Sequence, residues 1–150
     1  MFQFQNTKSL ILPYGFFLEL NRAPSPQELN RLLSRSKADT YPPRKLDLAL
    51  QNSFCNLSIL EENTMELLGF VRITTDQGLN ANLWDLVAAP GKHQHEFLAV
   101  LISHSLSIIR KELPGCSVSV AAPSNAIRFL ENEGFIIDPG GIRTMAFKIK

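Results

Sequence analysis

The sequence has almost no net charge and no long apolar run, and each absence excludes a class of protein. Fifteen basic residues stand against fourteen acidic ones, a formal charge of +1, so the chain lacks the positive field with which proteins usually bind nucleic acids. No apolar run reaches the roughly 18 residues that a membrane span requires. The N-terminal residues do not show the pattern of a signal peptide, which is a charged segment followed by an apolar stretch and a cleavage site. We therefore expect a soluble, cytoplasmic protein with no nucleic-acid partner and no membrane span.

Cysteine is also scarce, with only Cys55 and Cys116 in the whole chain. Both lie in apolar segments that read as buried strands, where cysteine usually serves as a small hydrophobe, so we expect two reduced thiols. Neither has a histidine or a basic residue beside it in the sequence, which disfavours a cysteine nucleophile.

What the sequence does contain is the composition of one globular domain. Hydrophobic residues make up 45% of the chain and charged residues 19%, and a chain of 150 residues can bury roughly 70% of the surface that its unfolded form exposes. We expect a single domain over residues 1–150, without internal repeats.

Local patterns predict alternating strands and helices. Ser25, Pro26 and Glu28 form the signature of a helix start, and apolar residues between Glu96 and Leu113 recur at helical spacing. Strands are expected at residues 14–20, 54–60, 67–75, 79–89, 117–122 and 143–150. One helix is expected to start at residue 25, and a second, short helix is expected to reach about residue 52. Two further helices are expected over residues 96–113 and 125–132. This order implies one parallel pair in a mostly antiparallel sheet. The opening segment, residues 1–13, is expected to form a short strand, with a docking surface for a partner as the alternative.

Three phrases carry a resemblance to a known family: LLGFVRITTDQG at residues 67–78, NANLWDLV at 80–87 followed by Pro90, and GFIIDPGGIRTM at 134–145. They resemble the plastid and cyanobacterial branch of the GNAT N-acetyltransferases, which includes plant serotonin N-acetyltransferase-like proteins. The resemblance implies an α/β (α+β) GNAT fold, in which a mixed, mostly antiparallel sheet splays between strands 4 and 5 and is flanked by about four helices. It also implies that acetyl-CoA enters the gap between those strands.

The resemblance places the CoA contacts on the fourth strand and on the helix that follows it. Backbone groups of Leu86, Val87 and Ala88 would pair with the pantetheine arm. The pyrophosphate would bind the family's glycine motif, whose bare N–H groups and helix dipole hold negative charge. In this chain the motif is degenerate, because its positions are occupied by His93, Gln94, His95, Glu96, Phe97 and Leu98. A carboxylate in the first helical turn is itself favoured by about 0.3–1 kcal/mol and would repel a pyrophosphate, whereas the two histidines could donate hydrogen bonds to it.

The catalytic positions have changed as well. The family's general-acid tyrosine falls on Leu130, which cannot donate a proton. Asp85 could deprotonate an incoming ammonium group, or it could satisfy nearby backbone or arginine groups, and the sequence leaves both roles open. A metal site that combines His93, His95 and Glu96 with His104 is disfavoured, because a helix start turns adjacent side chains to different sides. No metal is expected.

Two hypotheses follow for the function. The first is a GNAT protein with a degenerate active site, weakly active or inactive, that acts as an interaction or regulatory module. The second is a functional acetyl-CoA-dependent N-acetyltransferase acting on a small-molecule or protein amine, with a backbone N–H of Val87 or Ala88 polarising the thioester and Asp85 as base. The expected partner is a small amine or a protein, and a homodimer stays open. If side chains of His95, Glu96 or Phe97 fill the gap between strands 4 and 5, the first hypothesis, an interaction or regulatory module, is favoured.

Overall fold

The computed structural model of the chain describes residues 10–149. Its strands are β1 (Phe16–Leu20), β2 (Cys55–Glu61), β3 (Leu67–Thr75), β4 (Asn80–Ala88) and β5 (Ser117–Val120), and its helices are α1 (Pro26–Arg35), α2 (Pro43–Gln51), α3 (Gln94–Glu112) and α4 (Ile127–Asn132). Short 3-10 turns lie at Ser124–Ala126 and Pro139–Gly141. Most expected elements are therefore confirmed, with ends that shift by a few residues.

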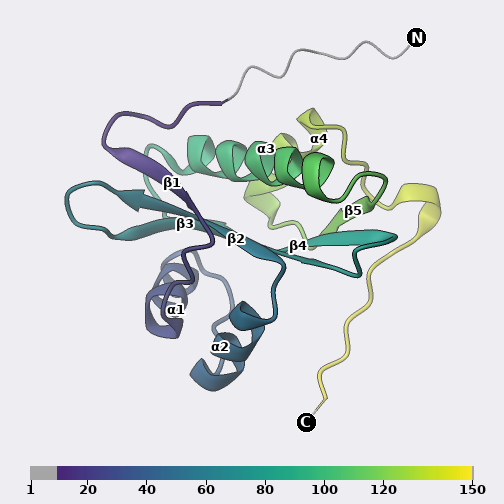
Figure 1. The fold of residues 1–150 in the computed structure, drawn as a ribbon, viewed down its shortest axis with the longest axis horizontal. Helices are drawn as coiled ribbons and strands as arrows, with labels where there is room; N and C mark the ends of the chain where they lie inside the picture. Colours follow the sequence, from purple (N-terminus) through teal and green to yellow (C-terminus); the bar gives the residue numbers. More distant parts are fainter. Residues whose placement is uncertain (1–9, 150) are drawn as a thin grey trace.

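The strands form one mixed sheet in the order β1-β2-β3-β4-β5. Neighbours from β1 to β4 pair antiparallel, and β4 pairs parallel with β5 after the crossover through α3. Helices α3 and α4 cover one face of the sheet, and α1 and α2 cover the other (Figure 1). The predicted single parallel pair is confirmed.

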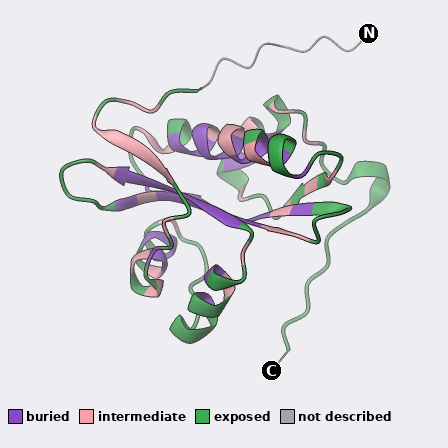
Figure 2. Ribbon diagram, in the orientation of Figure 1, coloured by how far each residue is buried: buried purple, intermediate pink, exposed green. Residues whose placement is uncertain are grey.

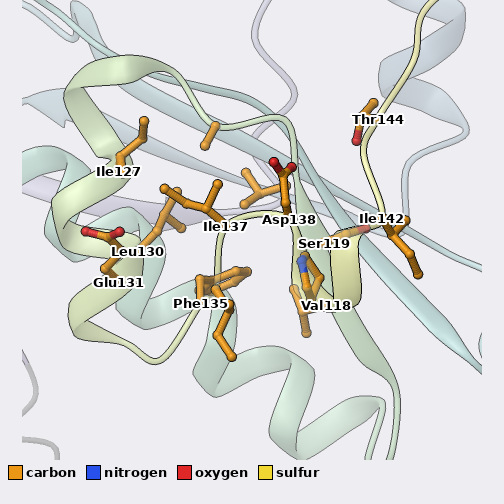
Figure 3. Close-up of a pocket in the computed structure, with 14 residues that line it drawn as sticks. Val118, Ser119, Ile127, Leu130, Glu131, Phe135, Ile137, Asp138, Ile142 and Thr144 are labelled. Carbon is orange, nitrogen blue, oxygen red and sulfur yellow. The ribbon is translucent and has the colours of Figure 1, made fainter.

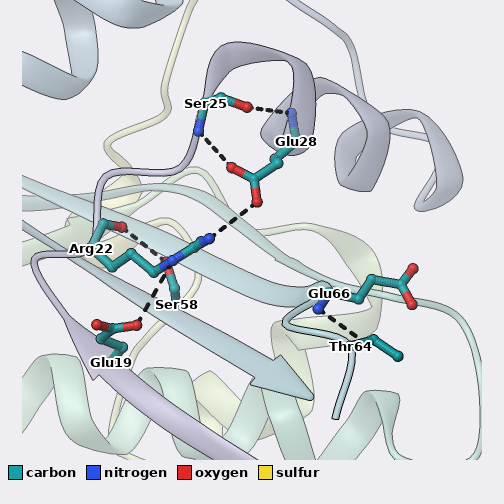
Figure 4. Close-up of polar contacts among 7 residues, drawn as sticks. All are labelled: Glu19, Arg22, Ser25, Glu28, Ser58, Thr64 and Glu66. Carbon is teal, nitrogen blue, oxygen red and sulfur yellow. Dashed lines mark hydrogen bonds and ion pairs between the residues drawn. The ribbon is translucent and has the colours of Figure 1, made fainter. Parts of the chain in front are cut away.

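Helix α1 begins where the sequence predicted, because Ser25 and Glu28 form a complete capping box. The Ser25 hydroxyl accepts from the Glu28 N–H at 3.2 Å, and the Glu28 carboxylate accepts from the Ser25 N–H at 2.8 Å. The same carboxylate accepts from Arg22 at 3.2 Å, as Figure 4 shows. The helix then buries Leu29, Leu32 and Leu33 against the sheet.

Buried apolar side chains form one cluster on each face of the sheet, and the purple segments in Figure 2 mark both. The cluster under α3 includes Leu57, Ile59, Ile73, Leu98 and Leu101, and the cluster under α1 and α2 includes Leu29, Leu46, Leu60 and Phe70. Gly69 lets α3 approach closely, because a Cβ there would lie 3.1 Å from Ile59 and 3.2 Å from Leu101. Both faces of the central strands are thus covered.

The sheet splays between β4 and β5, as predicted. The two strands pair only over Asn80–Leu83 and Ser117–Val120, and β4 continues to Ala88 beyond the last pair. A bulge occurs on the other side of β4, since Trp84 pairs with Arg72 but Val87 pairs with Phe70. Asp85 lies in this bulge with a φ of 55°. A bulge bends its strand and increases the local twist, and this bulge lies just beyond the point where the pairing of β4 with β5 ends.

Three expectations about individual segments need correction. The strand expected at residues 143–150 does not form, because residues 142–149 lie extended with no paired neighbour, and Lys150 falls outside the described residues. Residues 10–13 form no strand, and residues 1–9 fall outside the described part. Cys116 precedes β5 and is half-buried, whereas Cys55 is buried in β2 as expected. Across residues 10–149, no helix has the length and apolarity to cross a membrane.

Candidate functional site

The candidate site lies where the unpaired half of β4 meets the start of α3. Leu86, Val87 and Ala88, the three positions expected to contact a pantetheine arm, are all buried in β4. Ala88 is the C-terminal residue of that strand, and α3 begins at Gln94 only a few residues later. The structure therefore brings both groups of predicted CoA contacts to one end of the gap.

The carbonyl of Ala88 already has partners within the chain. It accepts a hydrogen bond from the Ser36 hydroxyl at 3.0 Å and another from the Gln94 amide at 3.0 Å. A carbonyl oxygen has two lone pairs, so these two donors satisfy it. Gln94, expected beside a pyrophosphate, instead folds back onto β4.

The first turn of α3 carries a carboxylate held by its own N-cap residue. His93 is the N-cap, but its side chain makes no capping bond to the backbone. Its Nδ1 lies 2.8 Å from Glu96 Oε1, and the Glu96 side chain remains 52% exposed. A negative charge therefore stands at the positive end of the helix dipole, where the family motif would place a glycine and receive a phosphate.

The other motif positions divide between the core and the neighbouring helix. Leu98 is fully buried under the sheet, and Phe97 packs edge-on against Phe16 with ring centroids 5.0 Å apart. His95 instead packs against Phe129 of α4, with centroids 5.5 Å apart. Of the three residues expected to fill the gap if the protein is a module, only His95 reaches across from α3 to α4.

Asp85 joins three elements through its two carboxylate oxygens. Oδ1 accepts from the Tyr41 hydroxyl at 2.8 Å, and Oδ2 accepts from Arg72 Nε at 2.5 Å. The Asp85 side chain is only 4% exposed. The guanidinium of Arg72 also lies 5.8 Å from the Trp84 ring centroid. Partial burial, together with the hydrogen bond and negative charge of Asp85, raises the pKa of Tyr41 to about 12. Tyr41 is therefore a hydrogen-bond donor at neutral pH.

Leu130, the position of the missing tyrosine, is buried in α4 and lines a hollow of about 390 Å³ beside β5 (Figure 3). His104 is distant in the chain and lies 3.5 Å from the Leu10 carbonyl oxygen. Within residues 10–149, no three His, Cys, Asp or Glu side chains gather in a way that would hold a metal ion. Burial raises the pKa of the Cys55 thiol to about 11, so it is not the thiolate that nucleophilic attack requires.

Sequence reasoning missed Tyr41, Arg72 and Ser36 as contacts of the site. Arg72 could have been found, because it pairs with Trp84 in the predicted hairpin of β3 and β4. Tyr41 and Ser36 come from the connection between α1 and α2 and carry no local signal. Their contacts depend on how that connection packs against β4.

Comparisons with known proteins agree with the resemblance seen in the sequence. The chain is 29% identical over 131 residues to an uncharacterised N-acetyltransferase, ycf52, of Pyropia yezoensis. The aligned region covers 86% of this chain and 75% of that relative. It is 28% identical over 137 residues to the chloroplastic GCN5-related N-acetyltransferase 1 of Arabidopsis thaliana, covering 89% and 68% of the two chains. A solved probable acetyltransferase from Staphylococcus aureus superposes with a TM-score of 0.78 at 15% identity, over 89% of this chain and 100% of that one. No family model matches the chain.

Proposed function

Because the chain belongs to the GNAT N-acetyltransferase superfamily, we propose from its altered cleft that it serves as an interaction or regulatory module in which acetyl transfer is weak or absent. Superfamily membership implies acetyl-CoA as the cofactor and an amine as the acceptor. The proposal therefore depends on how the residues of this cleft would receive CoA.

The single observation that carries the proposal is the Glu96 carboxylate in the first turn of α3. It is half exposed, accepts no hydrogen bond from the backbone N–H groups of its own helix start, and is paired with His93 at 2.8 Å. A pyrophosphate arriving at this helix end would meet a like charge instead of bare N–H groups. The residues present at this end do not fit a pyrophosphate.

Two further features support the same conclusion. Ala88 offers no free lone pair to a pantetheine amide, since Ser36 and Gln94 already donate to its carbonyl. Leu98, at the last position of the degenerate motif, is fully buried, so the core excludes the backbone approach that a glycine there would allow. At this end of β4 the chain's own side chains occupy the Ala88 carbonyl, which suits a surface that binds a protein more than a slot that binds a nucleotide.

The alternative, a functional acetyltransferase for a small-molecule or protein amine, draws on one specific observation. Beyond Leu83 the β4 edge that faces β5 has no strand partner, so backbone groups from Trp84 onward face the gap. Asp85 would be the base of such an enzyme, but both of its oxygens accept hydrogen bonds from Tyr41 and Arg72. A base in that position would first have to lose one of these partners.

Isothermal titration with acetyl-CoA and CoA at low salt tests the proposal. The proteins are the wild type, Glu96→Gln, which removes the charge, and Glu96→Gly, which also removes the side chain. Glu112→Gln at the other end of α3 is the matched charge control. We expect no micromolar binding by the wild type or the control, and a gain of about tenfold, 1.4 kcal/mol, for each Glu96 variant.

A different pattern would favour the enzyme. Micromolar binding by the wild type, about −8 kcal/mol, together with acetylation of an amine, would contradict the proposal. If the charge control gains as much affinity as the Glu96 variants, the effect comes from net charge and not from the helix start.

A further inference from the structure

Positive charge is concentrated on α1, α2 and the connection between them. Residues 31–45 contain five basic side chains and one acidic side chain, Asp39, so this stretch has a net charge of +4. The whole chain has a net charge of +1, so the rest of it is negative overall, at −3. We call residues 31–45 the basic stretch. Its cations are all exposed, and they are Arg31, Arg35, Lys37, Arg44 and Lys45.

Only one cation of the basic stretch has an acidic partner within residues 10–149. Arg35 pairs with Glu66. The other four form no ion pair with any carboxylate of the described chain. Like charges that lie close together on a surface repel one another, so this arrangement does not stabilise the fold. It is the pattern expected of a surface that meets an opposite charge on another molecule.

The first turn of α2 places two of these cations where the helix itself disfavours them. Arg44 and Lys45 lie in this turn, which contains no acidic residue, and the N-cap residue Pro42 makes no side-chain capping bond. Cations are unfavourable at the positive end of a helix dipole. The last turn of α3 has the opposite arrangement, because Arg110 and Lys111 lie at the negative end of that helix. At α2 the positive charge therefore comes at the expense of helix stability.

Exposed apolar side chains accompany the cations of α2. Leu48 follows Arg44 by four residues and Lys45 by three, so the three side chains are neighbours on the helix surface. Leu48 is 60% exposed, whereas Leu46 and Leu50 are buried on the opposite side of the helix. Figure 2 shows the exposed outer side of α2 in green. This side of α2 thus combines positive charge with apolar surface, as protein interfaces often do.

The connection that precedes α2 is held in place by hydrogen bonds at Tyr41. The Asn30 side chain donates to the Tyr41 carbonyl at 2.8 Å and accepts from the Tyr41 N–H at 3.0 Å. The Tyr41 hydroxyl donates to Asp85 at 2.8 Å, yet Tyr41 remains 40% exposed. Pro42 and Pro43 fix φ at the next two positions. A partner would therefore meet an ordered surface, which lowers the entropic cost of association.

We propose that the outer side of α2, together with the connection before it, docks an acidic and partly apolar segment of a partner protein. Carboxylates of that segment pair with Lys37, Arg44 and Lys45, and its apolar side chains contact Tyr41 and Leu48. A nucleic-acid strand would meet the same cations but would leave the exposed Leu48 without an aliphatic neighbour, so a protein segment is the better fit. This inference rests on the proposed function as an interaction module and gives the chemistry of the partner.

Fluorescence anisotropy with a labelled synthetic peptide tests the docking. The probe is a short peptide of glutamates interspersed with leucines, and its counterpart has glutamine in place of every glutamate. The α2 variant is Arg44→Glu with Lys45→Glu. The matched control is Arg110→Glu with Lys111→Glu, which makes the same change in net charge at the end of α3. Measurement at physiological salt screens charges more than about 8 Å apart, so that net charge alone has little effect.

We expect the wild type and the control to bind the acidic peptide and not its glutamine counterpart. The α2 variant should bind the acidic peptide about tenfold more weakly.

Thermal unfolding of the same proteins separates lost docking from a damaged fold. The α2 variant places carboxylates at the positive end of its helix dipole and should raise the unfolding midpoint by about 2 °C. The control makes the same reversal at the negative end of α3 and should lower the midpoint by about the same amount. The expected α2 variant is thus more stable than the wild type and yet binds the peptide less tightly.

Three results would overturn the docking proposal. One is a wild type that does not bind the acidic peptide, and another is an equal loss of binding in the α2 variant and the control. The third is tighter binding of a single-stranded oligonucleotide with the same number of negative charges, because the surface would then recognise a nucleic acid. Failure of the proposed function is a separate result, since it requires CoA binding together with acetylation of an amine.

Discussion

Helices α1 and α3 both have a glutamate at the third helical position, yet the two carboxylates do different things. Glu28 of α1 accepts a hydrogen bond from the backbone N–H of its N-cap residue, Ser25, at 2.8 Å. Glu96 of α3 instead meets the imidazole of its N-cap residue, His93, and stays half exposed. The N-cap residue makes the difference, since a serine returns a bond to the helix backbone and this histidine does not.

A glutamate at the third helical position can therefore cap one helix, as Glu28 does, and only add negative charge at the start of another, as Glu96 does. At α1 the backbone groups are satisfied and the helix is stabilised. At α3, the end that binds phosphate in the superfamily, the carboxylate contributes mainly its negative charge. Stability measurements on both helix starts therefore separate a structural role from an electrostatic one.

The largest effect is expected from restoring a glycine to α3 at Leu98. Leu98→Gly removes a fully buried side chain and places glycine in a helix, so it should lower the free energy of unfolding by about 3–6 kcal/mol. Urea denaturation measures this. Leu48→Gly, at an exposed leucine of α2, is the control and should lose only about 1 kcal/mol. Similar losses in both variants would contradict the core role of Leu98.

The two glutamates give the next largest effect. Glu28→Ala removes the capping bond to Ser25 and the contact with Arg22, and should destabilise the protein by about 1–2 kcal/mol. Glu96→Ala should destabilise it by about 0.5 kcal/mol, because only a dipole interaction and an exposed contact are lost. Equal losses in parallel denaturation curves would show that Glu96 also caps its helix.

A smaller effect is expected at the first residue of α3. Gln94→Ala removes one donor from the Ala88 carbonyl and should lower the free energy of unfolding by about 0.5–1 kcal/mol. Gln51→Ala breaks a hydrogen bond between exposed side chains within α2 and should change it by less than about 0.5 kcal/mol. If the two variants lose the same amount, the Gln94 contact adds no more stability than a surface pair.

The smallest effect is a pH dependence at α1. Burial disfavours the Glu28 carboxylate, but hydrogen bonds from Ser25 and Arg22 outweigh it and hold its pKa below the ordinary 4.5. The native state therefore binds the proton less tightly than the unfolded state does. The stability advantage of the wild type over Glu28→Gln should be complete well above pH 4.5 and shrink as the pH falls below it. An advantage that grows in acid would contradict this.

The elements that the sequence predicted well are those with local signals. The start of α1 follows from Ser25, Pro26 and Glu28 alone, and the hairpins that join β2, β3 and β4 follow from alternating strands and the turns between them. Residues 143–149 have an equally clear alternation but form no strand. A strand needs a neighbour, and residues 143–149 pair with none of the described strands.

The sequence predicted where the candidate residues lie in the fold but not what they contact. Counting from Pro90 located His93 to Leu98 at the start of α3, where the structure has them. The sequence pattern did not predict the direction of each side chain: His95 contacts α4, and Gln94 folds back to β4. The contact between Tyr41 and Asp85 spans 44 residues of sequence, so it depends on tertiary packing alone.

The Ala88 carbonyl, with its donors from Ser36 and Gln94, has a consequence for any attempt to build a CoA site into this chain. A substitution of Glu96 changes only the charge at the helix start and leaves this oxygen and the buried Leu98 as they are. Releasing the carbonyl or shortening Leu98 would each remove a contact that stabilises the fold. Thermal stability is therefore the property that limits how far such a site could be built into this scaffold.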